Sequence, residues 1–294
     1  MSAPAKHKAN AEPRWLRLVL TGVGLGFLFF FLALPLLAVF VEAFKGGWSA
    51  YIEALRHPET LSAIGLTLFI ALFVLPFNVI VGVAAAWAIA KFDFRGKSLL
   101  ITLIDLPFAV SPVVVGLVFL LIFGAQGLFG GWLSAHDVKV VFALPGMILV
   151  TLFITFPFVA RELIPLMQAQ GKDEEEAAIS LGATGWQMFR RVTLPNIKWG
   201  LLYGVLLSNA RAMGEFGAVS VVSGHIRGET NTLPLHVEIL YNEYNAVGAF
   251  ASASVLALLA LVTLLAKTVV EWQMRRETEM LQAVLQPEAA RSQP

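Results

Sequence analysis

Residues 60–90 read TLSAIGLTLFIALFVLPFNVIVGVAAAWAIA and contain no Asp, Glu, Lys or Arg between Glu59 and Lys91. A helix rises about 1.5 Å per residue, so about 20 apolar residues are enough to cross the hydrocarbon layer of a membrane. The stretch exceeds that length. It therefore predicts a membrane-spanning helix and a fold built in lipid.

The composition of the whole chain agrees with this prediction. Of 294 residues, 57% are hydrophobic and only 14% are charged, against about 25% charged residues in an ordinary soluble domain. Such a chain cannot supply a polar surface for a soluble fold of this length, and it is too apolar to be disordered. The absence of cysteine excludes disulfides, thiolate metal sites and cysteine nucleophiles. The fold class expected is an all-α integral membrane protein.

Apolar runs with few or no charged residues predict six membrane spans, which place both ends of the chain on the same side. The third span contains Pro107 and Pro112 and is expected to be kinked or broken. The first is read as an uncleaved helix, because it is longer than the apolar core of a signal peptide. The predicted spans are about 18–41, 60–90, 99–124, 140–164, 196–223 and 245–268.

The lysines and arginines predict the orientation. Most of them lie before residue 18, between spans two and three, between spans four and five, and after residue 266. Because basic residues accumulate in cytoplasmic segments, these segments and both termini are expected in the cytoplasm. The predicted division is a cytoplasmic segment 1–17, one transmembrane domain 18–271 with a cytoplasmic loop at about 165–195, and a cytoplasmic tail 272–294.

The loop after span four carries the most specific local pattern. It opens with Asp173-Glu174-Glu175-Glu176, which suits the N-terminus of a helix. Gly182 and Gly185 then predict a turn, and Trp186, Phe189 and Val192 repeat at a spacing that predicts a second short helix. This helix–turn–helix could be an amphipathic hairpin lying on lipid or a docking element for a partner protein. Periodicity alone does not separate the two.

No catalytic, nucleotide-binding or metal-binding motif is recognisable in the sequence. Gly96-Lys97-Ser98 lacks the first glycine and the preceding strand of a phosphate-binding loop. The five histidines show no metal-ligand spacing. We therefore expect no catalytic residue, no metal site and no cofactor bound by this chain.

The loop resembles the "EAA" loop of ATP-binding-cassette importer permeases. Glu176-Ala177-Ala178 is followed by Gly182 and by Val192-x-Leu194-Pro195 at the family's spacing, with Val192 in place of isoleucine. The resemblance implies a type I importer permease fold in which this loop forms coupling helices that dock on two copies of an ATPase subunit carrying ATP-Mg. The residues it implies for coupling are Glu176, Ala177, Ala178, Gly182, Phe189, Leu194 and Pro195.

Two further segments narrow the resemblance to the sulfate, molybdate and tungstate permeases. These are Ala210-Arg211-Ala212-Met213-Gly214-Glu215-Phe216-Gly217-Ala218 and the stretch from Asp105 to Gly116. The segment from Ser223 to Tyr244 favours the sulfate/thiosulfate importers. The resemblance implies a bacterial inner-membrane protein with a sister permease, an extracytoplasmic sulfate/thiosulfate-binding protein and membrane lipid as partners, and no nucleic acid. A molybdate/tungstate permease, a stand-alone secondary anion transporter and an assembly factor without transport remain alternatives.

Arg211 and Glu215 are ionisable residues within a predicted span, and such residues are functional candidates. Arg211 offers a permanent charge and up to five donors to a dianion, and Glu215 lies one helical turn further on. Together with Ser111 and Pro112 they form the predicted translocation path. The alternative is that the pair only neutralises itself or ties the span to another subunit. Asp105 is expected to be a capping or packing partner.

Overall fold

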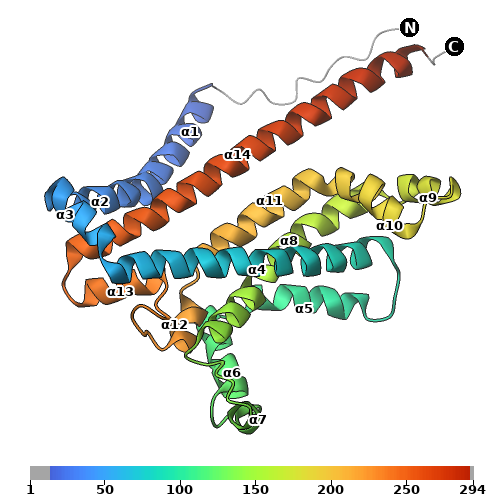
Figure 1. The fold of residues 1–294 in the computed structure, drawn as a ribbon. Helices are drawn as coiled ribbons and strands as arrows, with labels where there is room; N and C mark the ends of the chain where they lie inside the picture. The colour runs from blue at the N-terminus through green and yellow to red at the C-terminus, as the bar shows by residue number, and fades with distance from the viewer. Residues whose placement is uncertain (1–13, 292–294) are drawn as a thin grey trace.

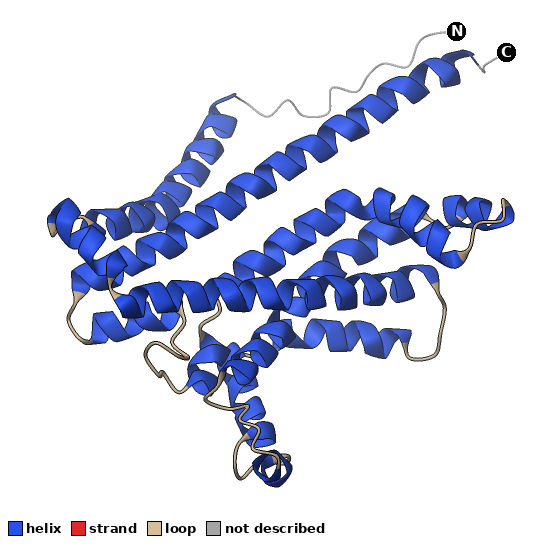
Figure 2. Cartoon of the chain, in the orientation of Figure 1, coloured by secondary structure: helices blue, strands red, loops and turns tan. Residues whose placement is uncertain are grey.

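The computed structural model describes residues 14–291, and every regular element in that range is helical (Figures 1 and 2). Positions 1–13 of the predicted N-terminal segment and 292–294 of the predicted tail lie outside the described residues. The elements are α1 (Arg14–Leu28), a π-helical turn (Phe29–Ala33), α2 (Leu34–Ala43), α3 (Gly47–Arg56), α4 (Pro58–Lys91), α5 (Lys97–Ala109), α6 (Pro112–Phe123), α7 (Gly130–Ala135), α8 (Leu144–Gln170), α9 (Asp173–Ser180), α10 (Gly185–Met188), a second π-helical turn (Phe189–Thr193), α11 (Leu194–Met213), α12 (Gly217–Ser223), α13 (Leu233–Asn242) and α14 (Ala246–Arg291).

Four helical segments are long and apolar enough to cross a membrane: Trp15–Ala43, Pro58–Lys91, Leu144–Gln170 and Ala246–Met274. A fifth candidate is the pair α5 and α6, which meet at an angle of 109°. The predicted break in the third span is confirmed. It falls at Ser111, whose ψ of 134° is extended, because proline at the next position disfavours the helical conformation.

The predicted span 196–223 is divided in the structure. α11 ends at Met213, and α12 begins at Gly217 after a short non-helical break. The segment carries Lys198, Arg211 and Glu215 and is not among the helices that are apolar enough to count as candidate spans. Six spans therefore remain a prediction. The sixth predicted span is continued by a helical segment, since α14 extends to Arg291.

The centre of the fold is the packing of α4, α8 and α11. A Cβ added to Gly82 of α4 would lie only 2.6 Å from the Cβ of Val159 on α8, so glycine permits this close approach. In the same core the Asn78 amide donates to Thr155 Oγ1 at 2.7 Å and to Ser208 Oγ at 2.9 Å. Hydrogen bonds of this kind join helices in lipid, where no hydrophobic difference drives association.

Two ends of the molecule are distinguished in Figure 1. α9 and α10 lie at the end where α4 runs into α5, while α6, α7 and α12 lie away from it. The segments 92–96 and 171–195 therefore lie at the same end of the fold. α14 packs against α2, α3 and α13, and Tyr51 Oη lies 3.0 Å from Ser254 Oγ in that contact.

Candidate functional site

The loop that resembles a coupling loop forms a helix–turn–helix. All four acidic residues predicted to begin a helix stand in the first turn of α9, where they face the partial positive charge of the helix end. Gly182 follows with φ of +89°, a conformation that costs other L-residues about 1–2 kcal/mol. Thr184 and Gln187 then form a reciprocal capping box at the start of α10, with backbone-to-side-chain distances of 2.9 and 3.3 Å. The sequence analysis missed this capping box, although its Thr-x-x-Gln spacing is readable.

A buried ion pair fastens this loop to the bundle. Lys91, the last residue of α4, places its Nζ 3.3 Å from Glu175 Oε1 on α9, and the two side chains are 6% and 11% exposed. The Lys91 ammonium also donates to the Gly171 carbonyl. The Thr193 hydroxyl donates to the same Glu175 oxygen at 2.6 Å. We call Lys91, Glu175 and Thr193 the loop clamp, because it joins α9 to the end of α4 and the start of α11.

The predicted coupling residues differ in their exposure and contacts. Glu176, Ala177 and Gly182 are exposed on the outer side of the loop. Phe189 and Leu194 instead pack against the core of α4, α8 and α11, with the Phe189 ring 5.3 Å from that of Trp87. Ala178 is half-buried, and Pro195 occupies the first turn of α11.

The outer side of the loop also exposes large apolar side chains. Leu181 is 89% exposed, Trp186 on α10 is 69% exposed and Ile179 on α9 is 53% exposed. Exposed apolar groups gathered on a short loop favour contact with another surface.

The predicted path residues Arg211 and Glu215 form an ion pair. Arg211 Nη1 lies 2.6 Å from Glu215 Oε2; the Glu215 side chain is 1% exposed and that of Arg211 is 32% exposed. The second carboxylate oxygen of Glu215 accepts from the Ala218 backbone N–H at 3.0 Å. Glu215 therefore also caps the start of α12, a role that the sequence analysis did not assign to it.

The structure brings Ser111 and Pro112 to the same place as this ion pair. They form the corner between α5 and α6, and that corner packs against α12. A Cβ on Gly217 would lie 3.0 Å from the Pro112 Cβ, and one on Gly116 would lie 2.8 Å from the Ala218 carbonyl oxygen. The break in the third span and the break between α11 and α12 therefore meet, two residues from Glu215.

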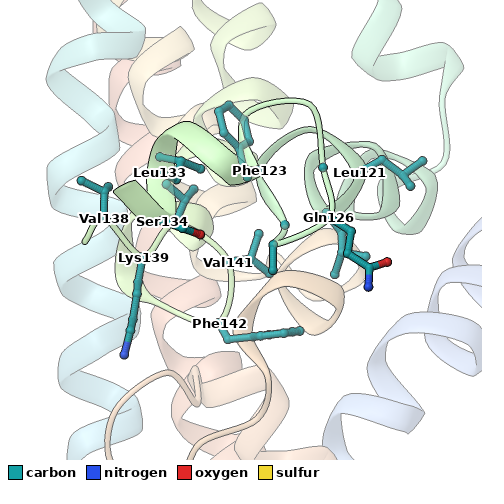
Figure 3. A pocket seen from close by; sticks show the side chains of 15 residues that line it. Leu121, Phe123, Gln126, Leu133, Ser134, Val138, Lys139, Val141 and Phe142 are labelled. Carbon is teal, nitrogen blue, oxygen red and sulfur yellow. The ribbon is translucent and has the colours of Figure 1, made fainter. Parts of the chain in front are cut away.

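A cavity of about 580 Å³ lies away from these residues, between the end of α6, α7 and segment 138–142. Figure 3 shows the side chains that surround it, including Phe123, Leu133 and Val141. Its lining is mostly apolar and contains none of the predicted site residues.

The described helices define a polytopic helical membrane protein with an exposed helix–turn–helix at one end. A family model described as binding-protein-dependent transport system inner membrane component matches residues 78–277. The chain belongs to this family of ATP-binding-cassette importer permeases, as the loop resemblance predicted.

Individual relatives agree. The chain is 53% identical over 274 residues to the sulfate transport system permease protein CysW of Escherichia coli (strain K12), covering 93% of this chain and 94% of the relative. It is 51% identical to CysW of Synechocystis, covering 86% and 92%. It is 36% identical to the Escherichia coli sulfate transport system permease protein CysT, covering 83% and 88%.

Solved structures support the fold. A chain from a bacterial ATP-binding-cassette transporter involved in the import of the acidic polysaccharide alginate matches with a TM-score of 0.72 at 19% identity. The match covers 89% of this chain and 96% of that chain.

Proposed function

We propose that this chain is a transmembrane permease subunit of an ATP-driven sulfate/thiosulfate importer. It forms half of the anion path and couples that path to a separate ATPase subunit. The observation that carries the proposal is the 53% identity to a sulfate permease along nearly the whole length of both chains. That extent includes the loop, the α5–α6 corner and the segment with Arg211.

The proposed assembly contains this chain, a CysT-like sister permease, two ATPase subunits that bind ATP-Mg, and an extracytoplasmic sulfate/thiosulfate-binding protein. The existence of two related sulfate permeases, CysW and CysT, supports a permease pair. An alginate importer of similar fold has been crystallised with a periplasmic protein that carries its substrate, which supports a binding-protein partner. The proposed topology has six spans in a bacterial inner membrane, with α5–α6 and α11–α12 each making one broken span and both termini in the cytoplasm.

Coupling is proposed to run through α9 and α10. The exposed group of Glu176, Ala177 and Gly182, together with the exposed Leu181 and Trp186, would dock on the ATPase. The loop clamp would pass its displacement to α4 and α11, because it keeps α9 attached to both helices. ATP-driven closure of the ATPase dimer would in this way move the spans and open the path outward.

Arg211 is proposed to attract the anion in the path. A dianion buried without compensating charge or donors costs many kcal/mol, and the partly exposed Arg211 guanidinium supplies both. Glu215 would hold that guanidinium and offset its charge, so that the anion is bound weakly and can leave. The non-helical break beside Glu215 supports the proposal, since irregular backbone at membrane depth is tolerated where it lines a cavity or is buried in protein.

The test compares Arg211→Met, Glu215→Gln and the double variant in the reconstituted complex. Glutamine at 215 retains an oxygen that can cap α12, so a loss of the cap is not confused with a loss of the charge. Arg211→Met alone leaves Glu215 buried and unpaired, at a cost of about 3–5 kcal/mol, and complex yield should fall. The double variant should recover yield and ATPase activity but not sulfate uptake. Near-native uptake by the double variant would show that both residues have only a packing role.

A further inference from the structure

A second ion pair lies in the half of the fold nearer to α9, on a face that residues 14–291 leave uncovered. Arg161 Nε on α8 is 3.2 Å from Asp105 Oδ1 on α5, and the side chains are 55% and 45% exposed. The Arg161 guanidinium carbon also lies 4.9 Å from the centre of the Phe108 ring. Both contacts come from α5.

The pair lies deep between the helix ends. Asp105 is eight residues from the start of α5 at Lys97, and Arg161 is nine residues from the end of α8 at Gln170. At 1.5 Å per residue these positions are roughly 12 and 13 Å from the loops that join the helices. Charged groups at such depth are costly in lipid, and they face the bundle interior or a water-filled cavity.

Polar residues continue from this pair toward the loops. Ser98, Thr102 and Asp105 are spaced as i, i+4 and i+7 and therefore lie on the same face of α5, where Ser98 and Thr102 are exposed. Gln168 follows Arg161 by seven residues on α8 and is exposed as well. We call Ser98, Thr102, Asp105, Arg161 and Gln168 the polar stripe. Leu99, Leu103 and Leu106 form the neighbouring exposed face of α5, which is suited to lipid or to an apolar partner surface.

Arg161 has donors to offer on this face. Among the described residues its ion pair with Asp105 is made through Nε, and the two terminal nitrogens carry four further N–H groups. Guanidinium groups of this geometry bind tetrahedral and planar oxyanions. Asp105 holds the guanidinium from one side and offsets its charge, as Glu215 does for Arg211.

We propose that the polar stripe lines the cytoplasmic half of the anion path, and that Arg161 is a second contact for a divalent oxyanion such as sulfate. The proposal rests on the proposed function. It gives the anion two successive cationic positions. The first is Arg211, beside the break between α11 and α12, and the second is Arg161 on α8, nearer to the coupling loop. Asp105 then acts as a positioning residue rather than the packing partner that the sequence predicts.

The first experiment measures water access. The chain contains no cysteine, so Thr102→Cys and Leu103→Cys introduce single thiols at adjacent positions and equal depth. The complex is assembled with cysteine-free partners, and an anionic, membrane-impermeant thiosulfonate is added from the ATPase side. Thr102→Cys should react at least ~10-fold faster than Leu103→Cys, since the reacting thiolate forms in water and not in lipid. Sulfate should slow the reaction at Thr102→Cys.

The second experiment separates a contact with the anion from a structural ion pair. Arg161→Gln with Asp105→Asn removes both charges together, and Arg161→Lys keeps the cation. The double variant should assemble and hydrolyse ATP but import sulfate about 10–100-fold more slowly, the loss expected for one charge-assisted hydrogen bond. Arg161→Lys should retain most of the uptake.

Equal reactivity of the two cysteine variants, no protection by sulfate, or normal uptake by the double variant would each overturn the inference. An unreactive Thr102→Cys would indicate that the sister permease covers this face. A wild-type complex that imports no sulfate would contradict the proposed function instead, because water access to Thr102→Cys does not depend on which anion is carried.

Discussion

Breaking one partner of the loop clamp should uncouple the loop from the spans. Lys91→Met leaves the Glu175 carboxylate buried, with the Thr193 hydroxyl as its remaining side-chain partner among the described residues. Removing one member of a buried ion pair costs about 3–5 kcal/mol. Because 1.4 kcal/mol is a factor of ten, the attached position of α9 should lose about 100-fold or more in relative population.

The assay measures sulfate imported per ATP hydrolysed, together with the stimulation of ATPase activity by the binding protein. Lys91→Met should lower both. Adding Glu175→Met should restore much of the coupling, since no buried charge then remains and Thr193 keeps a contact with Met188 Sδ at 3.2 Å. Glu174→Gln is the matched control, because Glu174 is the exposed neighbour on α9 that contacts Asn196. Like most surface substitutions, Glu174→Gln should change the free energy of unfolding only slightly, and both measured quantities should stay near their wild-type values.

A Lys91→Met variant with normal coupling would refute the reasoning, because it would mean that the clamp does not transmit motion. A double variant as defective as the single would show that the fault lies in packing rather than in the unpaired charge.

Three further outcomes are expected. Gly182→Val should lower ATPase co-purification and sulfate uptake while membrane insertion persists, because φ at residue 182 is +89°. Gly185→Ala should behave as wild type, because open space surrounds residue 185 and its φ is not positive. Equal effects of the two variants would mean that the backbone conformation of Gly182 is not the cause. Single cysteines at the exposed positions Ser180 and Glu229 should be labelled only from the cytoplasmic side and only from outside, respectively, and reversed labelling would overturn the topology. Burial holds the pKa of His236 on α13 below its ordinary value of 6.5, so the folded state binds fewer protons than the unfolded state and the Tm of the complex should fall as pH drops below about 6.5. His236→Gln should flatten this dependence of Tm on pH. An unchanged slope of Tm against pH would exclude His236 as its origin.

Local signals accounted for much of the fold. Charge-free runs located the four long apolar helices, and the prolines of the third span predicted that it is kinked or broken. The acidic run at 173–176 marked the start of α9. Each of these features depends on the chemistry of residues that are close in sequence, so the sequence alone was enough.

Helix boundaries inside apolar stretches were not predictable in the same way. The fourth span was expected from residue 140, but α8 begins at Leu144. Residues 140–143 are apolar but lie in a loop. In this loop Phe142 has a φ of +56°, and its backbone N–H donates to the Val222 carbonyl at 2.7 Å. That bond joins segments far apart in the chain, and hydropathy does not register it. The sequence analysis also overlooked α13, although Pro234 in its first turn is a helix-start signal.

The candidate site was predictable as motifs but not as contacts. The loop and the Arg211–Glu215 pair were singled out because their residues are neighbours in sequence. The loop clamp and the Arg161–Asp105 pair join residues on separate helices, and no local pattern identifies them. The first depends on how α9 packs against the ends of α4 and α11, and the second on how α5 packs against α8.

ATP-dependent uptake of labelled anions tests the central claim most directly. The complex of this chain, its sister permease, the ATPase and the binding protein is reconstituted in vesicles, with ATP on the ATPase side. Labelled sulfate should accumulate only with ATP and the binding protein, and excess thiosulfate should compete with it while molybdate competes weakly. Uptake of molybdate in preference to sulfate would contradict the substrate assignment, and sulfate uptake driven by an ion gradient without ATP would contradict the account of an ATP-coupled permease.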